Sequence, residues 1–247
     1  MPGLDWLKRP IAHRGLHDAE NGIIENTQTA FHGALKAGYA IETDVRFSGD
    51  GAVMVFHDPT LDRLTTLQGR VDAMSVPELK KVQYKDTSDR MQTLPELLEQ
   101  VDGRVPLVIE IKSNWADHGP LERRLAECLE NYTGPVAVMS FDPYSVAAFA
   151  TAAPGVARGL VAEKFNDPHY WSDLTAWQRF TMRHLLSGFI ARPQFIAYDI
   201  HALPACAPLS ARHLLGWPLL TWTVRSQDER QRAARWADAM IFEGFRP

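Results

Sequence analysis

The sequence predicts an α/β fold in which eight parallel strands close into a barrel. The chain has 247 residues, and an α/β barrel typically needs about 250. Short apolar segments alternate with helical segments along the chain, and most of them are continuous rather than strictly alternating. Continuous apolar strands are typical of a parallel sheet that is buried on both faces. Hydrophobic residues make up 45% of the chain, which is ordinary for a packed globular protein.

Nine segments are expected to form strands. They are Pro10–His13, Ala40–Val45, Ala52–Phe56, Leu107–Ile111, Val136–Phe141, Arg158–Ala162, Phe195–Asp199, Leu219–Val224 and Met240–Phe242. The third belongs to an excursion at about residues 46–90, which we interpret as an inserted subdomain between the second barrel strand and its helix. Eight strands remain, and this number favours a closed barrel over an open sheet. The whole chain, residues 1–247, is expected to form a single domain.

Helix-start signals separate these strands. Ser75-Val76-Pro77-Glu78 and Thr93-Leu94-Pro95-Glu96 are capping boxes with proline in the first turn, where it costs no hydrogen bond. Asp142-Pro143 and Ser226-Gln227-Asp228-Glu229 are expected to start two further helices. Residues 27–37 carry their apolar side chains on one stripe, as an amphipathic helix does.

The composition of the chain bears on its binding partners and on its location in the cell. The chain has 26 basic and 30 acidic residues, a net charge of -4, and no long basic run. We therefore do not expect it to bind nucleic acid. Cys128 and Cys206 lack ligand-type spacing and are expected to be reduced thiols without a site role. Neither a secretory signal nor an apolar stretch of about 18 residues is evident. We therefore expect a cytoplasmic protein without a membrane span.

Titratable side chains lie at the ends of the first three expected barrel strands. His13 ends the first strand, Glu42 and Asp44 the second, and Glu110 and Lys112 follow on the third. Residues two apart in a strand share a face. The active site of a parallel barrel lies at the C-terminal ends of its strands. We therefore expect these side chains to converge at one mouth of the barrel.

The three carboxylates at this mouth point to a divalent cation. Glu42, Asp44 and Glu110 would repel one another and would be costly to desolvate without a counter-charge. Ligation by oxygen alone suits a hard ion such as Mg²⁺ or Ca²⁺. The alternative is a structural ion-pair network in which Arg46 and Lys112 neutralise the carboxylates.

His13 and His57 are the candidate proton-transfer groups, because histidine exchanges protons near neutral pH. Cleavage of a phosphodiester needs one group to activate the nucleophile and another to protonate the leaving alkoxide. The turn His57-Asp58-Pro59 is rigid, which fits either a held imidazole or a plain structural turn. The remaining histidines are expected to be structural. They are His17, His32, His118, His169, His184, His201 and His213.

Four further residues are candidates for substrate binding or support. Arg14 offers a planar donor fork suited to phosphate, and Lys112 a point charge; the alternative for Arg14 is a salt bridge at the bottom of the barrel. Asn26 is expected either to cap the first helix or to support the site. Trp222 is expected either to wall the substrate pocket or to fill the barrel.

Residues 166–192 form a distinctive aromatic and amphipathic stretch. Tyr170, Trp171, Trp177 and Phe180 lie within it. It fits an outer helix that packs its aromatic residues on the barrel; a lid, or an apolar rim for a lipid-like substrate, is the alternative. Glu163, just before it, could reach the mouth of the barrel, but a surface or structural role is favoured.

These residues together resemble the glycerophosphodiester phosphodiesterase family. The matching elements are His13-Arg14-Gly15, Glu25-Asn26-Thr27, Ile41-Glu42-Thr43-Asp44-Val45, His57-Asp58-Pro59-Thr60-Leu61-Asp62-Arg63, Glu110-Ile111-Lys112 and Trp222-Thr223-Val224. The resemblance runs from about residue 10 to the C-terminus and is densest before residue 113. It implies a TIM barrel with a small insertion after strand two.

The resemblance also implies a mechanism. Glu42, Asp44 and Glu110 would hold a divalent ion, His13 and His57 would form the acid/base pair, and Arg14, Lys112 and Trp222 would contact a small phosphodiester substrate. The implied reaction is hydrolysis of a glycerophosphodiester to glycerol 3-phosphate and an alcohol. The alternatives are a lysophospholipase D-type enzyme with weak lipid contact and, from another class, a barrel that binds without turnover. The oligomeric state stays open.

Two departures from the family pattern concern the leaving alcohol. Ile24 stands where a proline usually precedes the Glu-Asn-Thr element, which is a small change. Family members often close with Thr-Asp-x-Pro after the last strand, whereas residues 242–247 read Phe-Glu-Gly-Phe-Arg-Pro. Because that loop lies at the barrel mouth, we expect the substrate pocket to differ there.

Overall fold

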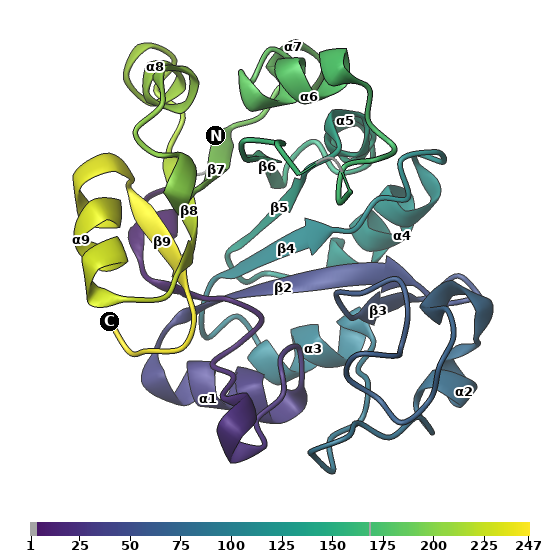
Figure 1. The fold of residues 1–247 in the computed structure, drawn as a ribbon. Helices are drawn as coiled ribbons and strands as arrows, with labels where there is room; N and C mark the ends of the chain where they lie inside the picture. Colours follow the sequence, from purple (N-terminus) through teal and green to yellow (C-terminus); the bar gives the residue numbers. More distant parts are fainter. Residues whose placement is uncertain (1–3, 168) are drawn as a thin grey trace.

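Eight parallel strands form a closed barrel in the computed structural model, which describes residues 4–167 and 169–247 (Figure 1). The strands are β1 (Ile11–Ala12), β2 (Ala40–Phe47), β4 (Leu107–Ile111), β5 (Val136–Ser140), β6 (Ala157–Ala162), β7 (Phe195–Asp199), β8 (Leu219–Val224) and β9 (Ala239–Phe242). The barrel closes because β1 pairs in parallel with both β2 and β9. The prediction of a TIM barrel is confirmed, and each expected barrel strand ends within two residues of the observed one.

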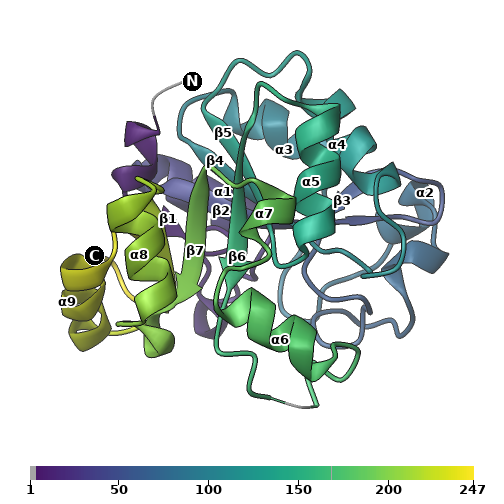
Figure 2. The same ribbon diagram turned by 90° about the horizontal axis from the view of Figure 1, so that it is seen from above.

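Helices surround the barrel on the outside, as the two ribbon views show (Figures 1 and 2). They are α1 (Gln28–Ala37), α3 (Leu94–Val101), α4 (Pro120–Leu129), α5 (Pro143–Ala152), α6 (Ala176–Arg183), α7 (Gly188–Ala191), α8 (Cys206–Leu214) and α9 (Gln227–Trp236). The expected helix starts are present: the Thr93 backbone N–H donates to Glu96 at 2.8 Å, and Asp142 accepts from two backbone N–H groups of α5. Short 3₁₀ turns complete the connections. They are η1 (Asp5–Lys8), η2 (Ala19–Asn21), η3 (Val71–Ala73) and η4 (Ile200–Ala202).

The segment between β2 and α3 departs from the regular alternation of strand and helix. Strand β3 (Val53–Val55) pairs antiparallel with β2, and α2 (Val76–Leu79) follows it. Met54, Phe56, Leu61 and Leu79 belong to a hydrophobic cluster that the segment forms largely from its own side chains. This packing holds the chain near His57 on the C-terminal side of the barrel strands.

The barrel interior is packed with side chains from alternate strand positions. Ile11, Val108, Ala197 and Leu220 belong to this inner cluster, together with Phe195. Gly159 lies beside Phe195 in the strand register, and a Cβ there would come within 2.2 Å of the Phe195 ring. A glycine is therefore required on β6 for the ring to fit, and the interior below the mouth is filled rather than open.

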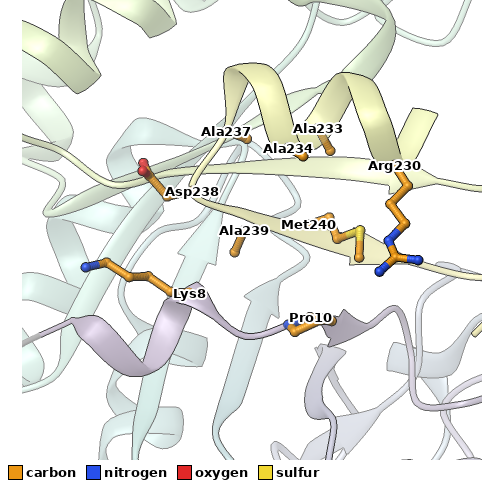
Figure 3. Close-up of a pocket in the computed structure, with 9 residues that line it drawn as sticks. All are labelled: Lys8, Pro10, Arg230, Ala233, Ala234, Ala237, Asp238, Ala239 and Met240. Atoms are coloured by element: carbon orange, nitrogen blue, oxygen red, sulfur yellow. The ribbon is translucent and has the colours of Figure 1, made fainter. Parts of the chain in front are cut away.

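A small cavity of about 160 Å³ lies at the opposite end of the barrel from the strand C-termini (Figure 3). Pro10 and Ala239, which precede or begin β1 and β9, line it together with Ala233 of α9. Its lining is mostly small apolar side chains, so we interpret it as a packing gap between α9 and the barrel. Within the described residues, no helix combines the length and apolarity needed to cross a bilayer.

Candidate active site

A cavity of about 450 Å³ opens at the C-terminal ends of the barrel strands. Side chains from β2, β4, β5, β6, β8 and β9 line it, together with residues that follow β1, β3, β4, β5, β6 and β8. The lining residues that the sequence singled out are His13, Arg14, Glu42, His57, Glu110, Lys112 and Trp222. Trp222 therefore walls this cavity. Asp44 lies fully buried beside this set.

The three carboxylates converge because they end adjacent strands in register. Asp44 is the direct register partner of Glu110 across β2 and β4, and Glu42 lies two residues before Asp44 on the same face. One oxygen from each of the three lies within 4.8 Å of the others, and all three residues are buried. The Oε1 atom of Glu42 is buried without a hydrogen-bond partner.

Burial affects these carboxyl groups unequally. It raises the pKa of Glu42 well above its usual value, and repulsion from Asp44 and Glu110 adds to that rise. Burial also acts on Asp44, but Lys112 and Arg14 more than offset it and hold its pKa well below the usual value. The side chains present do not fully neutralise three ionised carboxylates, so the cluster favours additional positive charge. A hard divalent cation fits the all-oxygen donor set and the unpartnered Glu42 oxygen.

Arg14 and Lys112 lie against the carboxylates at the mouth. The Nε atom of Arg14 is 3.2 Å from Asp44, and its backbone N–H donates to Glu42 at 3.0 Å. Lys112 Nζ is 3.0 Å from Asp44 and also binds Glu110. The neighbouring carboxylates raise the pKa of both cations despite their burial. Arg14 is therefore a mouth residue, and the alternative of a salt bridge at the barrel bottom is wrong.

The backbone after β1 turns sharply to place these groups. Arg14 has a φ of 55° and Gly15 a φ of 81°, both in the left-handed region. A Cβ on Gly15 would come within 2.9 Å of the Ala30 backbone in α1. Glycine is needed here because the turn combines positive φ with close approach to a helix. The turn directs the Arg14 N–H toward Glu42 on the neighbouring strand.

Asn26 supports the site rather than capping a helix. Its side-chain amide donates to Asp44 at 2.8 Å and accepts from the Thr43 hydroxyl at 2.8 Å. The N-cap of α1 is Thr27, whose hydroxyl accepts from the Ala30 N–H. Asn26 therefore fixes the orientation of the Asp44 carboxylate, and of the two alternatives the helix cap is wrong.

His13 forms a pair with a carboxylate that reaches it from the last strand. Its Nδ1 forms a short hydrogen bond to Glu243, and its Nε2 is 3.9 Å from Glu42. Burial lowers the pKa of His13, and Arg14 lowers it further, whereas Glu243 raises it. His17 and Arg225 also hold Glu243, at 3.3 Å and 2.7 Å. Although burial opposes its ionisation, these contacts keep the pKa of Glu243 below its usual value.

His57 is held in a parallel manner. Its Nδ1 is 2.6 Å from Asp58, and its backbone carbonyl accepts from Arg46 at 2.6 Å. Arg63 binds Asp58 and also bridges to Glu25. Burial raises the pKa of Asp58, but the hydrogen bonds from His57 and Arg63 outweigh burial and hold this pKa below its usual range. The turn therefore holds the imidazole. Arg46, considered above as a partner for the carboxylates, instead donates to the carbonyl of His57.

The far side of the cavity is aromatic and acidic. Phe141, Tyr170, Trp171 and Trp222 line it together with Glu163, which therefore reaches the mouth and does not lie on the outer surface. Trp171 is 6% exposed, whereas Tyr170 and Trp177 of the same segment are 68% and 69% exposed. Residues 166–192 therefore contribute both a packed aromatic wall and an exposed aromatic rim.

Sequence reasoning missed the role of Glu243 and placed His17 among the purely structural histidines. The sequence feature that could have revealed Glu243 was its position directly after the last strand, in a tail that departs from the family pattern. Its partner His13 lies 230 residues away in sequence. Of the predicted site residues, His13, Arg14, Glu42, His57, Glu110, Lys112 and Trp222 all line one cavity.

Comparison with known proteins places this geometry in a family. The model of the "Glycerophosphoryl diester phosphodiesterase family" matches residues 13–244. A glycerophosphodiester phosphodiesterase from Caldanaerobacter subterraneus is 35% identical over 161 residues, which cover 61% of this chain and 65% of that protein. A second relative, from Bacillus altitudinis, is 33% identical over 61% of this chain and 64% of its own length. The match thus spans slightly less than two thirds of either relative.

A solved structure has the same fold. It is a phosphodiesterase from Oleispira antarctica in complex with the product sn-glycerol-3-phosphate, and it aligns with a TM-score of 0.79. The alignment covers 96% of this chain and 93% of the other at 22% sequence identity. The family match over nearly the whole barrel and the shared fold lead to one conclusion: the chain belongs to the glycerophosphoryl diester phosphodiesterase family.

Proposed function

We propose that this protein hydrolyses small glycerophosphodiesters to glycerol 3-phosphate and an alcohol. The observation that carries the proposal is one cavity shared by His13, His57, Glu42, Glu110 and Lys112, in which both histidines bind a carboxylate through Nδ1. Family membership and the names of the two bacterial relatives support the reaction class. The product bound to the Oleispira antarctica protein supports the glycerol phosphate half of the substrate.

Glu42, Asp44 and Glu110 would hold one divalent cation, Mg²⁺ or Ca²⁺. The unpartnered Glu42 oxygen and the raised pKa of that carboxyl support this assignment. When bound, such an ion would neutralise negative charge on the non-bridging phosphate oxygens. Arg14 and Lys112, which already border the cluster, would orient the phosphate by charge-assisted hydrogen bonds.

His13 and His57 would exchange the protons of the reaction through Nε2, because Nδ1 of each is occupied. One imidazole removes the proton from the attacking hydroxyl as a new P–O bond forms. The other donates a proton to the leaving alkoxide as the ester P–O bond breaks. The attacking hydroxyl is either water or the substrate's own glycerol 2-hydroxyl. In the second case a cyclic phosphate forms, and water then opens it.

The contact between Glu243 and His13 predicts the behaviour of Glu243→Gln. We expect kcat to fall by about tenfold or more with little change in KM, because Glu243 orients His13 and does not line the substrate cavity. Loss of the negative charge removes an interaction that raises the pKa of His13. The limb of the pH–rate profile that reports His13 should therefore move to lower pH. Steady-state kinetics across pH measures both effects.

The matched control is Glu20→Gln, because Glu20 is an exposed acid close to the same tail. It should leave kcat and the pH profile unchanged. Wild-type kcat and an unshifted profile in Glu243→Gln would show that the tail does not position His13.

The proposed reaction is tested by release of glycerol 3-phosphate from a panel of glycerophosphodiesters. Each is assayed with chelator, with Mg²⁺ and with Ca²⁺. We expect release only with a divalent ion, and the panel ranks the alcohols in the same experiment. Absence of release with every ion, from protein whose circular dichroism shows a folded state, would refute the proposal and favour a barrel that binds without turnover.

A second candidate is a lysophospholipase D-type reaction on lipid substrates. The observation that favours it is the rim of α6, where exposed Trp177 and Phe180 stack at 5.6 Å. Arg179 and Arg183 lie on the same helix and form no ion pair with any described residue. An aromatic and cationic rim suits weak contact with anionic lipid. This candidate would be supported if turnover of a lysophospholipid increases above the concentration at which it forms micelles, and if the double variant W177A/F180A loses this turnover but keeps its activity on small diesters.

We also propose that residues 1–247 function as a single domain with an inserted subdomain at about 46–90. The continuous barrel through β9 and the separate hydrophobic cluster around Phe56 support this division. The subdomain supplies His57 to the cavity. A single cooperative transition in thermal unfolding would be the expected behaviour.

A further inference from the structure

The active-site cavity is divided by charge. Arg14 and Lys112 lie on the side formed by β1, β2 and β4, where the phosphate would bind. Glu163 and Asp167, which follow β6, lie on the other side. A substrate that fits both sides carries a negative phosphate and, a short distance away, a positive group. Zwitterionic phosphodiesters have this distribution of charge.

Glu163 is a cavity carboxyl without a cationic partner. Its Oε1 accepts from Trp171 Nε1 at 2.6 Å, which fixes its position at the end of β6. Among the described residues, no Lys, Arg or His lies within ion-pair distance of it. Burial raises the pKa of Glu163, and Asp199 adds to the rise. A bound cation would supply the missing counter-charge.

Aromatic rings line the same cavity as this carboxyl. Phe141 contacts Trp222 at 5.4 Å with planes at 83°, and contacts Trp171 at 5.3 Å. Tyr170 meets Trp171 at 4.8 Å. These four rings come from β8 and from the loops after β5 and β6, and all four line the cavity. Ring faces attract a cation through the ring quadrupole, and aromatic cages are a recurrent means of binding quaternary ammonium groups.

The chemistry of this wall discriminates among cations. A primary ammonium carries three N–H donors, each of which needs an acceptor when it leaves water. Glu163 and Asp167 are the charged acceptors on this side, and Phe141, Trp171 and Trp222 offer ring surface in place of acceptors for further N–H groups. A trimethylammonium group has charge but no N–H donor, so it satisfies both the rings and the Glu163 carboxylate. A neutral polyol gains from neither.

We propose that the aromatic and acidic half of the cavity is a subsite for a quaternary ammonium group on the leaving alcohol, with Glu163 as the specificity-determining residue. The inference rests on the proposed phosphodiesterase function and adds to it the chemical class of the alcohol. Trp171 is a positioning residue in this subsite, because its indole N–H orients the Glu163 carboxylate.

The test compares kcat/KM for three diesters of glycerol phosphate, with choline, ethanolamine and glycerol as alcohols. We expect the wild type to prefer the choline diester. Glu163→Gln should lower kcat/KM for the choline diester by about tenfold, because the substitution removes one negative charge from a partly desolvated contact with a cation. The glycerol diester should change by less than about threefold. The matched control is Asp173→Asn, an exposed acid of the same loop outside the cavity, which should leave the ratio unchanged.

An equal fall on all three diesters in Glu163→Gln would make Glu163 a structural residue and overturn the subsite. Wild-type preference for the ethanolamine or glycerol diester would also overturn it. If no diester is hydrolysed, the proposed function fails, and the subsite is decided separately by binding of tetramethylammonium, measured by calorimetry. Binding that Glu163→Gln weakens at least fivefold supports the subsite; binding that is absent or unaffected refutes it.

Discussion

Replacing His13 by alanine is expected to lower kcat by about 10²–10⁴-fold while the barrel stays folded, and the same holds for His57. Each side chain lines the cavity and is held by a carboxylate at Nδ1. Neither belongs to the hydrophobic clusters that pack the barrel. The loss should therefore appear in turnover rather than in thermal stability. Steady-state kinetics and thermal unfolding of the two variants measure this.

A substrate with a good leaving group separates the two roles. A glycerol phosphodiester of p-nitrophenol needs little protonation of its leaving oxygen, so a variant that lacks the general acid should regain most of its activity on it. A variant that lacks the general base should not. The double variant should be little worse than the poorer single one, because the two groups act together in one step. The matched control is His32→Ala, an exposed histidine on α1. Near-normal turnover of either single variant on the natural diester would refute the pair.

Removing the divalent ion is expected to abolish turnover, and Glu42→Gln should raise the ion concentration for half-maximal activity by about 100-fold or more. Glu42, Asp44 and Glu110 provide the only group of three carboxylates in the described residues whose oxygens converge within 4.8 Å. Glutamine keeps the shape of Glu42 but removes one ionisable ligand. Mutating residues that only hydrogen-bond to metal ligands typically lowers metal affinity by about 10–100-fold. Changing a carboxylate that binds the ion directly should lower it at least as much.

Thermal unfolding gives a readout of this site that does not depend on activity. A ligand that binds only the folded state stabilises it by about 2.7 kcal/mol at a hundred times its Kd. Mg²⁺ or Ca²⁺ should therefore raise the Tm of the wild type but not that of Glu42→Gln. The raised pKa of Glu42 in the metal-free protein means that ion binding releases a proton, so the affinity should increase with pH. Glu130→Gln, on the surface after α4, is the control. Full activity in excess chelator would contradict the assignment.

The strands and most helix starts were predictable because local pattern encodes them. Continuous apolar runs such as 107–111 and 219–224 form strands buried on both sides, and Thr93 and Asp142 begin helices because they satisfy free N–H groups. Period-two alternation also placed Glu42 and Asp44 on one face of β2. These interactions span only a few residues, so the local sequence is enough to predict them without the tertiary structure.

The sequence by itself determined the barrel, the ends of its strands, and the residue types that those ends present. Only the tertiary structure decided which of these side chains bind one another. Glu243 reaches His13 because closure of the barrel pairs β9 with β1, and Asn26 reaches Asp44 because the turn after β1 folds over β2. Glu163 becomes a cavity residue because Trp171 holds it there. Such partners are set by strand register and by packing across the whole barrel, and neither has a local signature in the chain.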